Sequence, residues 1–591
     1  MAFDGIVAKS IVYELNTCII GGKINKIFEP NSNEIIVGIY SNGKNYALDI
    51  CIDSSNCRLN LTTHSKPNPI NAPSFCMLLR KHLIGFKIVS VNTVDLERIV
   101  TIKLEGYNEL NDLISKTLII ELMGKHSNII LLNESNRIID SLRHFDSSSK
   151  SNRNIMPSFE YNYPTSEKKS LLKTNTFDEF YKIISDKLES NKIEDILCNS
   201  FTGISKEFIY YMLNKEVGNN ERQNKWADRG VRPYIDNINK LQILYNNIKA
   251  ILNNINTNKV SPEETLNEKN KSDFVLKLSP KESNLSINYF IDDFYYNKEL
   301  NDTFINYKNT ISKLLLSNLN KNKKKLNNIT FKINECSRMD LYKLYGELIT
   351  ANLYRIKDEN QSEIELENYY DNNKPIIIPL DNSKTPSYNA KMYFKKYNKL
   401  KTALSIVEKQ KEKIIQELNY IESIIYTLES SETISDLDEI YEEISETVLT
   451  KDRSYKAKQI STKRKQLKKK VKDKTWIPIE YNIEGFKILI GKNNKQNDYL
   501  TCKSAKSNDL WFHTKDIHGS HLIIKTEGKD VPYEVLEKCA SLAAYYSKAR
   551  NSSNVPVDYC FIKYVKKPKN SKPGMVIYTN NKTINVKPEN I

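Results

Sequence analysis

Residues 400–428 of the chain read LKTALSIVEKQKEKIIQELNYIESIIYTL, and this stretch decides the fold that the sequence predicts. Its apolar residues recur at spacings of three and four, which is the pattern of a helix that buries one stripe. Lys411 occupies one position of the stripe. The apolar members are Leu400, Leu404, Val407, Ile414, Leu418, Ile421, Ile425 and Leu428. The pattern predicts one arm of an antiparallel coiled coil.

An upstream segment supplies the second arm with a looser version of the same spacing. Its apolar residues are Ile311, Leu315, Leu319, Leu326, Ile329 and Ile333. Residues 271–450 are therefore predicted to form a coiled-coil middle domain, with an insert at about 343–386 at its tip. A helix of about 45 residues is about 70 Å long, so the arm is suited to reaching a distant partner. The alternative is an ordinary bundle of long helices.

Residues 1–150 show the period of two that is typical of strands, within a predicted domain of residues 1–172. Asn42-Gly43, a dipeptide that favours tight hairpin turns, separates two alternating segments. The strands expected in this region are 34–40, 44–52, 87–94, 98–105, 117–121, 128–133 and 137–142. The helices expected there are about Val7–Asn16 and Pro73–Leu83. An antiparallel α+β domain is predicted.

Residues 175–265, within a predicted domain of residues 173–270, change to a helical period, and Phe201–Ser205 interrupts it with an apolar-Gly-apolar turn. Such a turn between two short helices is typical of a helix-hairpin-helix, in which glycine allows close backbone approach and the next helix offers amides to a phosphate. The alternative is an ordinary helix cap. We predict a small helix-hairpin-helix domain.

Residues 451–591 are predicted to be a basic linker followed by a compact α+β domain. Ten Lys or Arg and one Asp fall in residues 456–474. A charge run is usually a solvated linker, but beside other nucleic-acid signals it is interpreted as an RNA contact. The candidate RNA-binding residues there are Lys463, Arg464, Lys465, Lys468, Lys469 and Lys470.

The overall composition is that of a large folded protein with a basic balance. In 591 residues there are 88 Lys+Arg against 72 Asp+Glu, and hydrophobic residues make up 39%. These values exclude a wholly disordered or collagenous chain. The net charge of +16 favours a polyanionic partner, although an AT-rich coding bias toward Lys, Asn and Ile is an alternative explanation.

The cysteine pattern and the lack of long apolar runs indicate in which cellular compartment the protein is expected. Nine cysteines are scattered without a CxxC pair, as expected for reduced thiols. No basic leader with an apolar core and no run of 18 apolar residues occurs, so we expect a cytoplasmic protein with no membrane partner. Walker A, GxGxxG, HExxH and GxSxG motifs are also absent, which argues against a self-sufficient NTPase or hydrolase.

A histidine-rich segment, residues 511–521 (WFHTKDIHGSH), is the strongest local signal near the C-terminus. Metal binding requires the ligands to converge, and no carboxylate partner is evident, so no metal site is predicted. We interpret the segment as a basic, aromatic surface suited to RNA phosphates and bases. The candidates on it are Trp511, His513, Lys515 and His521.

Eight short segments occur in an order and at spacings that resemble one protein family. They are 3–5 (FDG), 73–83 (PSFCMLLRKHL), 121–128 (ELMGKHSN), 344–352 (LYGELITAN), 390–399 (AKMYFKKYNK), 491–498 (GKNNKQND), 565–568 (VKKP) and 572–574 (KPG). The resemblance is to the NFACT family and extends over nearly the whole chain. It implies an NFACT-N domain, a helix-hairpin-helix domain, a coiled-coil middle domain and a C-terminal NFACT-R domain.

The resemblance also implies a function in ribosome quality control. Such a factor binds a large (50S) ribosomal subunit that carries peptidyl-tRNA, recruits alanyl-tRNA, that is tRNA(Ala), and directs template-free alanine tailing of the nascent chain for degradation. An RqcP-like helper protein is the expected partner. Ribosomal RNA would catalyse peptidyl transfer. The protein is therefore expected to be an RNA-binding elongation factor that needs no cofactor, and it is not expected to be an enzyme.

By matching position, the resemblance assigns tRNA binding to Asp4, Glu97, Arg98, Glu121, Leu122 and Met123. Glu97 stands where the family has aspartate, and its extra methylene moves the carboxylate by about 1.5 Å. Each residue has a structural alternative. Asp4 could cap a helix, Glu121 could form a structural ion pair, and Leu122 and Met123 could be strand packing.

Two other functional classes were weighed against this one. A fibronectin-binding surface adhesin would require export. A DNA glycosylase of the formamidopyrimidine type, which NFACT-N also resembles, would require an N-terminal proline amine, but Ala2 and Phe3 stand there.

Overall fold

The computed structural model describes residues 3–145, 153–188, 192–216, 234–257, 259–267, 272–279, 286–356, 361–448, 478–569 and 571–590. The chain forms two compact units, residues 1–300 and residues 301–591. Both contain antiparallel strands and helices, and two helices among the described residues, α7 (Ile287–Cys336) and α9 (Pro386–Glu429), exceed 40 residues. The predicted α+β class with antiparallel sheets and long helices is confirmed.

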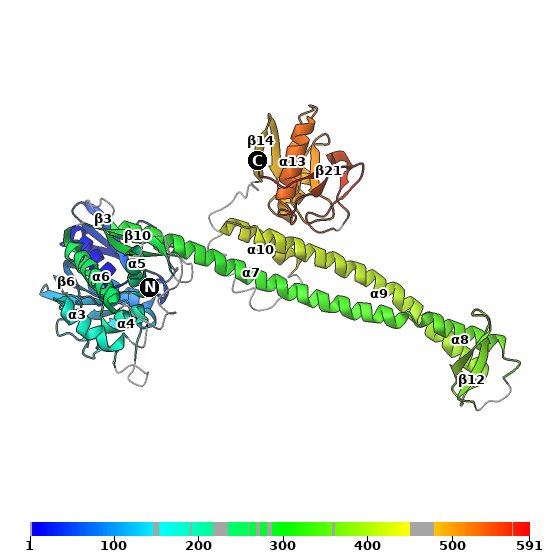
Figure 1. The fold of residues 1–591 in the computed structure, drawn as a ribbon, viewed down its shortest axis with the longest axis horizontal. Coiled ribbons are helices and arrows are strands. Elements are labelled where there is room, and N and C mark those ends of the chain that lie inside the picture. Colours follow the sequence, from blue (N-terminus) through cyan, green and yellow to red (C-terminus); the bar gives the residue numbers. More distant parts are fainter. Residues whose placement is uncertain are drawn as a thin grey trace. The chain divides into compact units, whose positions relative to one another are not determined.

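A nine-stranded antiparallel sheet forms the centre of the first unit (Figure 1). Its spatial order is β4-β3-β2-β1-β5-β6-β7-β8-β9. The strands are β1 (Lys23–Asn31), β2 (Glu34–Ser41), β3 (Lys44–Cys51), β4 (Arg58–Leu61), β5 (Lys87–Thr93), β6 (Ile99–Tyr107), β7 (Leu113–Glu121), β8 (Asn128–Leu132) and β9 (Ile138–Ser141). Helices α1 (Gly5–Cys18) and α2 (Ser74–Leu83) share its main core.

The hairpin predicted at Asn42-Gly43 is confirmed. Both residues have positive φ, 50° and 75°, and β2 pairs with β3 from Ser41 opposite Lys44 onward. Two strands of this sheet, β1 and β4, were not predicted. In β1 the pairing shifts register between Ile24 and Lys26 and again near its end, which breaks the period of two. Strand β4 is only four residues long and fully buried, so it does not alternate.

The remainder of the first unit is mainly helical. It contains α3 (Phe177–Ile184), α4 (Ile193–Ser200), α5 (Lys206–Glu216), α6 (Tyr234–Asn254) and the antiparallel strands β10 (Val260–Leu266) and β11 (Ser272–Leu278). Apolar side chains of these elements join the core of the sheet and α1 in one cluster. The first unit therefore has one continuous main core.

Helix α7 (Ile287–Cys336) begins in the first unit, where side chains fix its first turns. The carboxylate of Glu14 accepts hydrogen bonds from the amides of Ile287 and Asn288, at 2.7 and 3.1 Å. Glu14 therefore satisfies amides that the helix leaves without intrahelical partners. Further along, Glu299 pairs with the buried Arg58 at 2.7 Å.

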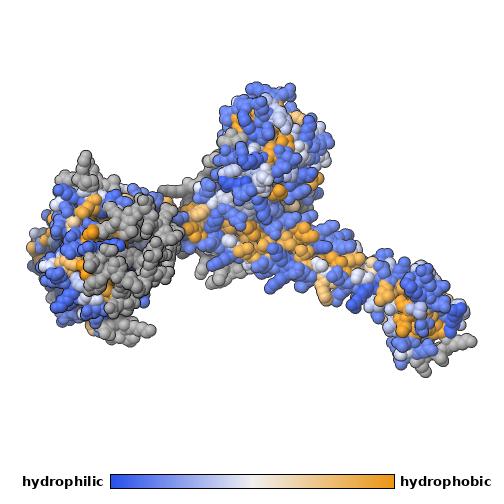
Figure 2. All heavy atoms as spheres, in the orientation of Figure 1, coloured by the Kyte–Doolittle hydropathy of each residue, from blue (hydrophilic) through white to orange (hydrophobic). Residues whose placement is uncertain are grey.

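In the second unit α7 runs beside α9 (Pro386–Glu429), and α10 (Ile434–Thr447) packs on the pair (Figure 1). The apolar seam includes Ile311 and Leu315 from α7 and Leu418 and Ile421 from α9. The predicted coiled-coil stripe is therefore buried at these positions. Figure 2 shows hydrophobic residues along the visible face of this helix pair, bordered by hydrophilic ones.

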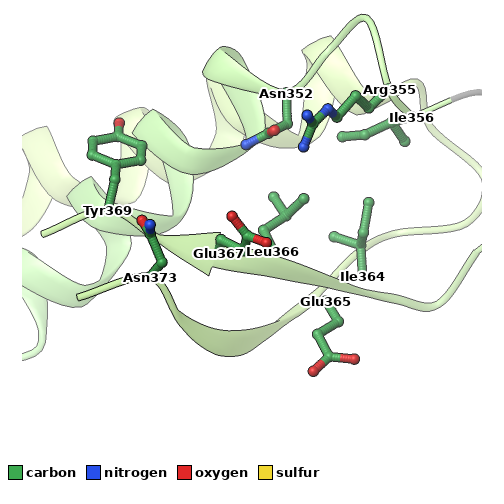
Figure 3. A pocket seen from close by; sticks show the side chains of 9 residues that line it. All are labelled: Asn352, Arg355, Ile356, Ile364, Glu365, Leu366, Glu367, Tyr369 and Asn373. Carbon is green, nitrogen blue, oxygen red and sulfur yellow. The ribbon is translucent and has the colours of Figure 1, made fainter. Parts of the chain in front are cut away.

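The far end of the helix pair carries a small globular insert. It consists of α8 (Met339–Ala351) and the hairpin β12 (Glu363–Asn368) and β13 (Lys374–Pro379), and it has its own apolar cluster. A polar pocket of about 340 Å³ lies in this insert. Figure 3 shows that Asn352 and Arg355 face Glu367 in it and that Glu365 points away.

The C-terminal domain contains a six-stranded sheet in the order β14-β15-β17-β16-β18-β21. The strands are β14 (Ile479–Ile483), β15 (Phe486–Ile490), β16 (Leu510–Thr514), β17 (Leu522–Lys525), β18 (Val555–Phe561) and β21 (Lys582–Val586). The other elements are α12 (Asn494–Tyr499), α13 (Tyr533–Tyr545) and the two-residue strands β19 (Val565–Lys566) and β20 (Ile577–Tyr578). Separate apolar clusters contain Phe512 and Trp511, so neighbouring residues of β16 are both covered.

Within the part of the chain that the structure describes, no helix has both the length and the apolar character of a membrane span.

Candidate nucleic-acid interface

Asp4 caps helix α1. Its Oδ1 accepts hydrogen bonds from the amides of Ile6 and Val7, both at 3.1 Å, and the residue is 6% exposed. The alternative that Asp4 is a helix cap is therefore confirmed. Its second oxygen, Oδ2, accepts a hydrogen bond from the Ser205 hydroxyl at 3.1 Å. Asp4 thus connects α1 to the turn that was predicted to be a helix-hairpin-helix.

That turn lies between α4 and α5, and its glycine meets the start of α1. The Gly203 carbonyl accepts hydrogen bonds from the amides of Gly5 and Ile6, at 3.0 and 3.2 Å. A Cβ on Gly5 would lie 1.8 Å from the Leu96 carbonyl oxygen, and a Cβ on Gly203 would lie 2.5 Å from the Leu96 Cβ. Only glycine fits at either position, because three backbone segments meet there.

Arg98 joins this cluster electrostatically. Burial raises the pKa of Asp4 to about 6, and the Arg98 charge opposes the rise. Burial likewise raises the pKa of Glu97, and the charges of Lys168 and Arg98 oppose it. The structure therefore brings together three of the residues assigned to tRNA binding, Asp4, Glu97 and Arg98.

Ser205 and Lys168 belong to the same cluster and were not among the predicted site residues. Ser205 both donates to Asp4 and accepts the amide of Phe208 at 3.2 Å, so it also caps α5. The sequence signal for Ser205 was its place two residues after Gly203. No local pattern marks Lys168, which comes close only through folding.

Glu121, at the end of β7, is 1% exposed and has its carboxylate engaged. It accepts hydrogen bonds from Arg153 Nη2 at 2.7 Å, Arg153 Nη1 at 3.3 Å and the Tyr161 hydroxyl at 2.7 Å. The alternative of a structural ion pair is therefore confirmed. Direct tRNA contact by Glu121 would require Arg153 and Tyr161 to leave it.

Leu122 and Met123 follow Glu121 and pack into apolar clusters. Leu122 is fully buried in the main core, and Met123 packs partly buried against a smaller cluster that includes Ile130 and Tyr161. The alternative of strand packing describes both contacts. Leu122 has no surface on which a tRNA could act directly.

The histidine-rich segment of the C-terminal domain is partly buried. Trp511 is fully buried, and its Nε1 has no hydrogen-bond partner among the described residues. His521 is 3% exposed and its Nδ1 lies 2.7 Å from the Thr501 hydroxyl. The prediction of an exposed aromatic surface is therefore wrong for Trp511 and His521. Lys515 is exposed, as predicted.

His513 lies on β16 and His521 directly precedes β17, and their ring centroids are 5.4 Å apart. Burial lowers the pKa of His513 to about 4, and burial together with His513 lowers the pKa of His521 well below its usual value. Both rings are therefore neutral at pH 7 and offer no charge to a phosphate.

The predicted basic residues Lys463, Arg464, Lys465, Lys468, Lys469 and Lys470 lie outside the described residues. Another basic segment, which resembled the family but was not assigned to RNA, is described. It includes the exposed lysines Lys563, Lys566, Lys567 and Lys569. This segment gives the C-terminal domain a positive surface beside β19.

Comparisons with known proteins identify the family. A model described as NFACT N-terminal and middle domains matches residues 4–464, and one described as NFACT protein RNA binding domain matches residues 474–580. The chain belongs to the NFACT family. The family resemblance seen in the sequence is thereby confirmed, and the C-terminal domain of this NFACT protein is the one that matches the RNA-binding model.

Curated relatives of this NFACT chain match it along its whole length. The Rqc2 homolog RqcH of Bacillus subtilis is 33% identical, with 100% of this chain and 98% of the relative covered. The Rqc2 homolog RqcH of Streptococcus suis is also 33% identical, with the same coverage. A solved structure, the C-terminal part of the fibronectin/fibrinogen-binding protein of Streptococcus suis, is 33% identical, covers 48% of this chain and 96% of its own, and has a TM-score of 0.37.

Proposed function

We propose that this protein is a cytoplasmic ribosome quality control factor. It binds a stalled large ribosomal subunit that carries peptidyl-tRNA, recruits alanyl-tRNA and directs template-free addition of alanine to the nascent chain. The observation that carries the proposal is the full-length similarity to RqcH proteins, together with the match of the C-terminal domain to the NFACT RNA-binding domain.

In this proposal the chain performs no bond chemistry of its own. Ribosomal RNA catalyses peptidyl transfer, and the protein supplies position. The cluster of Asp4, Gly203 and Ser205 supports that role, because it fixes the helix-hairpin-helix turn to the start of α1 through backbone and side-chain hydrogen bonds. Arg98 beside it supplies the positive charge for a tRNA phosphate.

Glu97 is the residue that separates this chain from the family pattern. Burial raises the pKa of its carboxyl, and Arg98 lies close enough to oppose the rise. We propose that Glu97 orients Arg98 as the family aspartate does, from a longer side chain. Glu97→Asp should then leave tRNA recovery equal to or above that of the wild type.

The test is to sequence the RNA that copurifies with tagged protein from cells with stalled translation. Wild-type protein should sediment with large subunits on a sucrose gradient and carry tRNA enriched in tRNA(Ala). Arg98→Ala should lose the tRNA and keep the subunits. Arg137→Ala, an exposed arginine of the same unit, is the matched control and should keep both. Equal tRNA recovery from Arg98→Ala would contradict the site assignment.

The adhesin hypothesis makes a different prediction for the same cells. Protease added to intact cells would remove a surface adhesin and would spare a ribosome-bound factor. Complete protection of the tagged protein excludes adhesion, and digestion without lysis excludes the ribosomal proposal.

A further inference from the structure

One face of α10 is a row of acidic side chains. Asp436, Glu439, Glu443 and Glu446 are spaced by three, four and three residues, so they share a face of the helix. A helix rises 1.5 Å per residue, and the row therefore places negative groups about 5 Å apart. This spacing is of the same order as that of phosphates along a nucleic-acid strand.

The C-terminal domain meets this row with a row of donors. Asn493 Nδ2 and Gln496 Nε2 both donate to Glu439 Oε2, at 2.6 and 2.8 Å. Asn494 Nδ2 donates to Glu443 Oε1 at 2.9 Å. These three donor side chains are 9% exposed or less.

Lys492, just before α12, and Lys495, in its first turn, complete the row. Lys495 Nζ lies 2.7 Å from Glu446 Oε2, and Lys492 Nζ lies 3.8 Å from Asp436 Oδ1. In each of these contacts the domain supplies the donor and the helix supplies the acceptor. The polarity is that of a protein holding the backbone of a nucleic acid, since phosphate oxygens also act only as acceptors.

Residues 492–496, which supply these donors, lie beside the basic segment of the domain. Gly574 approaches Asn494 closely, with its ideal Cβ 3.0 Å from Asn494 Oδ1, and its amide donates to Asp498 at 3.4 Å. Lys567 pairs with the same Asp498 at 2.6 Å, and Lys572 Nζ lies 4.5 Å from the ring centre of Tyr420 on α9. Residues 492–496, together with the exposed lysines Lys563, Lys566, Lys567 and Lys569 and with Lys572, therefore form one electropositive edge.

Part of this contact is open to solvent. Its charged pairs are partly exposed, with the side chain of Glu446 60% exposed, and exposed pairs are weak and screened by salt. Glu443 is buried, and burial raises its pKa to about 7 although Asn494 and Tyr420 donate to it. Holding the ionised carboxylate there carries a desolvation penalty, which an exposed state would relieve.

We propose that the acidic face of α10 is an internal mimic of RNA that covers the electropositive edge of the C-terminal domain, and that RNA binds this edge by displacing α10. The inference rests on the proposed function, because it requires that the C-terminal domain bind RNA. It adds a mode of regulation. In the free protein α10 covers the electropositive edge, and a large RNA such as that of the ribosomal subunit displaces α10 from it.

The test compares RNA affinities of the full-length chain. The double variant Glu439→Gln/Glu446→Gln keeps the shape of the row and removes two charges. If α10 covers the edge in about nine-tenths of the molecules, opening it lowers the apparent dissociation constant about tenfold. The probe is a fluorescein-labelled single-stranded RNA of about 20 nucleotides, long enough to span the edge.

The matched control is Glu412→Gln/Glu432→Gln, which makes the same change in net charge at two exposed glutamates of the second unit. Its dissociation constant for the probe should differ from that of the wild type by less than twofold, which is the effect expected from the change in net charge alone. A second measurement uses the unmodified protein: saturating RNA should accelerate hydrogen–deuterium exchange in residues 434–447.

The outcomes separate the two proposals. Tighter binding by the first double variant only, together with faster exchange in α10, supports the internal mimic. Equal binding by wild type and both variants, with no change in exchange, overturns the mimic and leaves RNA binding intact. Failure of all three proteins to bind the probe, while their thermal midpoints agree, overturns RNA binding by the C-terminal domain and the mimic with it.

Discussion

Two contacts in this molecule differ in how they are made. In the first unit the start of α1 meets the Gly203 turn through backbone groups, and the two glycines leave no room for a Cβ. In the second unit α10 meets the turn at Lys492–Gln496 through side chains only, and part of that contact is exposed. The first contact is sterically fixed, and the second is electrostatic.

The difference teaches which contact can change state. Packed backbone segments have one arrangement, and any added atom must displace one of them. A row of carboxylates facing donors can be replaced by any other row of anions, because the donors need only an acceptor. We therefore expect the Gly203 contact to persist throughout the work of the protein and the α10 contact to open.

The largest expected effect is that of Gly203→Ala. Its Cβ would lie 2.5 Å from the Leu96 Cβ at a φ of 84°, so overpacking and backbone strain add to about 4 kcal/mol of lost stability. Gly21→Ala is the matched control, because Gly21 has a φ of 72° with nothing within 4 Å, and should cost about 1 kcal/mol. Urea denaturation measures both. Equal losses would show that the close contact at Gly203 does not constrain the fold.

The next effect concerns the α1 cap. Asp4→Ala removes an acceptor for the amides of Ile6 and Val7 and should cost about 1–2 kcal/mol. Asp4→Asn keeps an oxygen acceptor and should cost less than half as much in the same urea titration. If the two variants lose the same stability, the carboxylate charge matters more than the cap.

Asp4 also predicts a dependence on pH. Burial raises its pKa from 3.8 to about 6, so the folded state binds the proton more tightly than the unfolded state does. The contribution of the protonated Asp4 carboxyl to the free energy of unfolding is fully present below pH 3.8 and is lost as the pH rises through about 6. The unfolding free energy of wild type minus that of Asp4→Asn should therefore fall between pH 4 and 6 and be flat above pH 7. A constant difference would contradict the assigned pKa.

A smaller pH effect is expected in the α10 contact. Glu443 faces Tyr420 from α9, Asn494 and Lys495 from the C-terminal domain, and Glu446 on its own helix. Burial raises the pKa of Glu443 from 4.5 to about 7. The contact between α10 and the C-terminal domain is therefore most stable below pH 4.5 and weakens as the pH rises through about 7. RNA affinity of wild type relative to Glu443→Gln should rise from pH 5.5 to 7.5, by about two- to fivefold. A ratio independent of pH would exclude this carboxyl as a titrating part of the contact.

The smallest effect is expected when the ionic strength is raised in the absence of RNA and hydrogen exchange in α10 is measured. At 0.5 M ionic strength the Debye length falls to about 4 Å, so exposed pairs such as Lys495–Glu446 are screened. Hydrogen exchange in residues 434–447 should increase modestly over that at 0.05 M, while exchange in α1 stays the same. Equal responses of both helices would remove the distinction between a steric and an electrostatic contact.

Periodicity predicted the elements that bury one regular face. The strands around Asn42-Gly43 are confirmed because the tight-turn dipeptide marks where the two strands meet. The stripe that includes Leu418 and Ile421 is confirmed because its apolar residues recur at spacings of three and four. The segment at Trp511 was misplaced for the opposite reason. Strand β16 lies between β17 and β18 with apolar clusters on both faces, so no alternation marks the side that would face solvent.

The sequence by itself determined the family, the antiparallel α+β class and the long helical arm, because ordered motifs and regular periods are local properties of the chain. It also supplied one side of each contact, since the Gly203 turn and the Gly491–Asp498 motif were visible as patterns. Only the tertiary structure decided what each pattern touches. Asp4 and Ser205 are about 200 positions apart, and Glu443 meets Asn494 across a basic linker, so their pairing depends on folding and not on spacing.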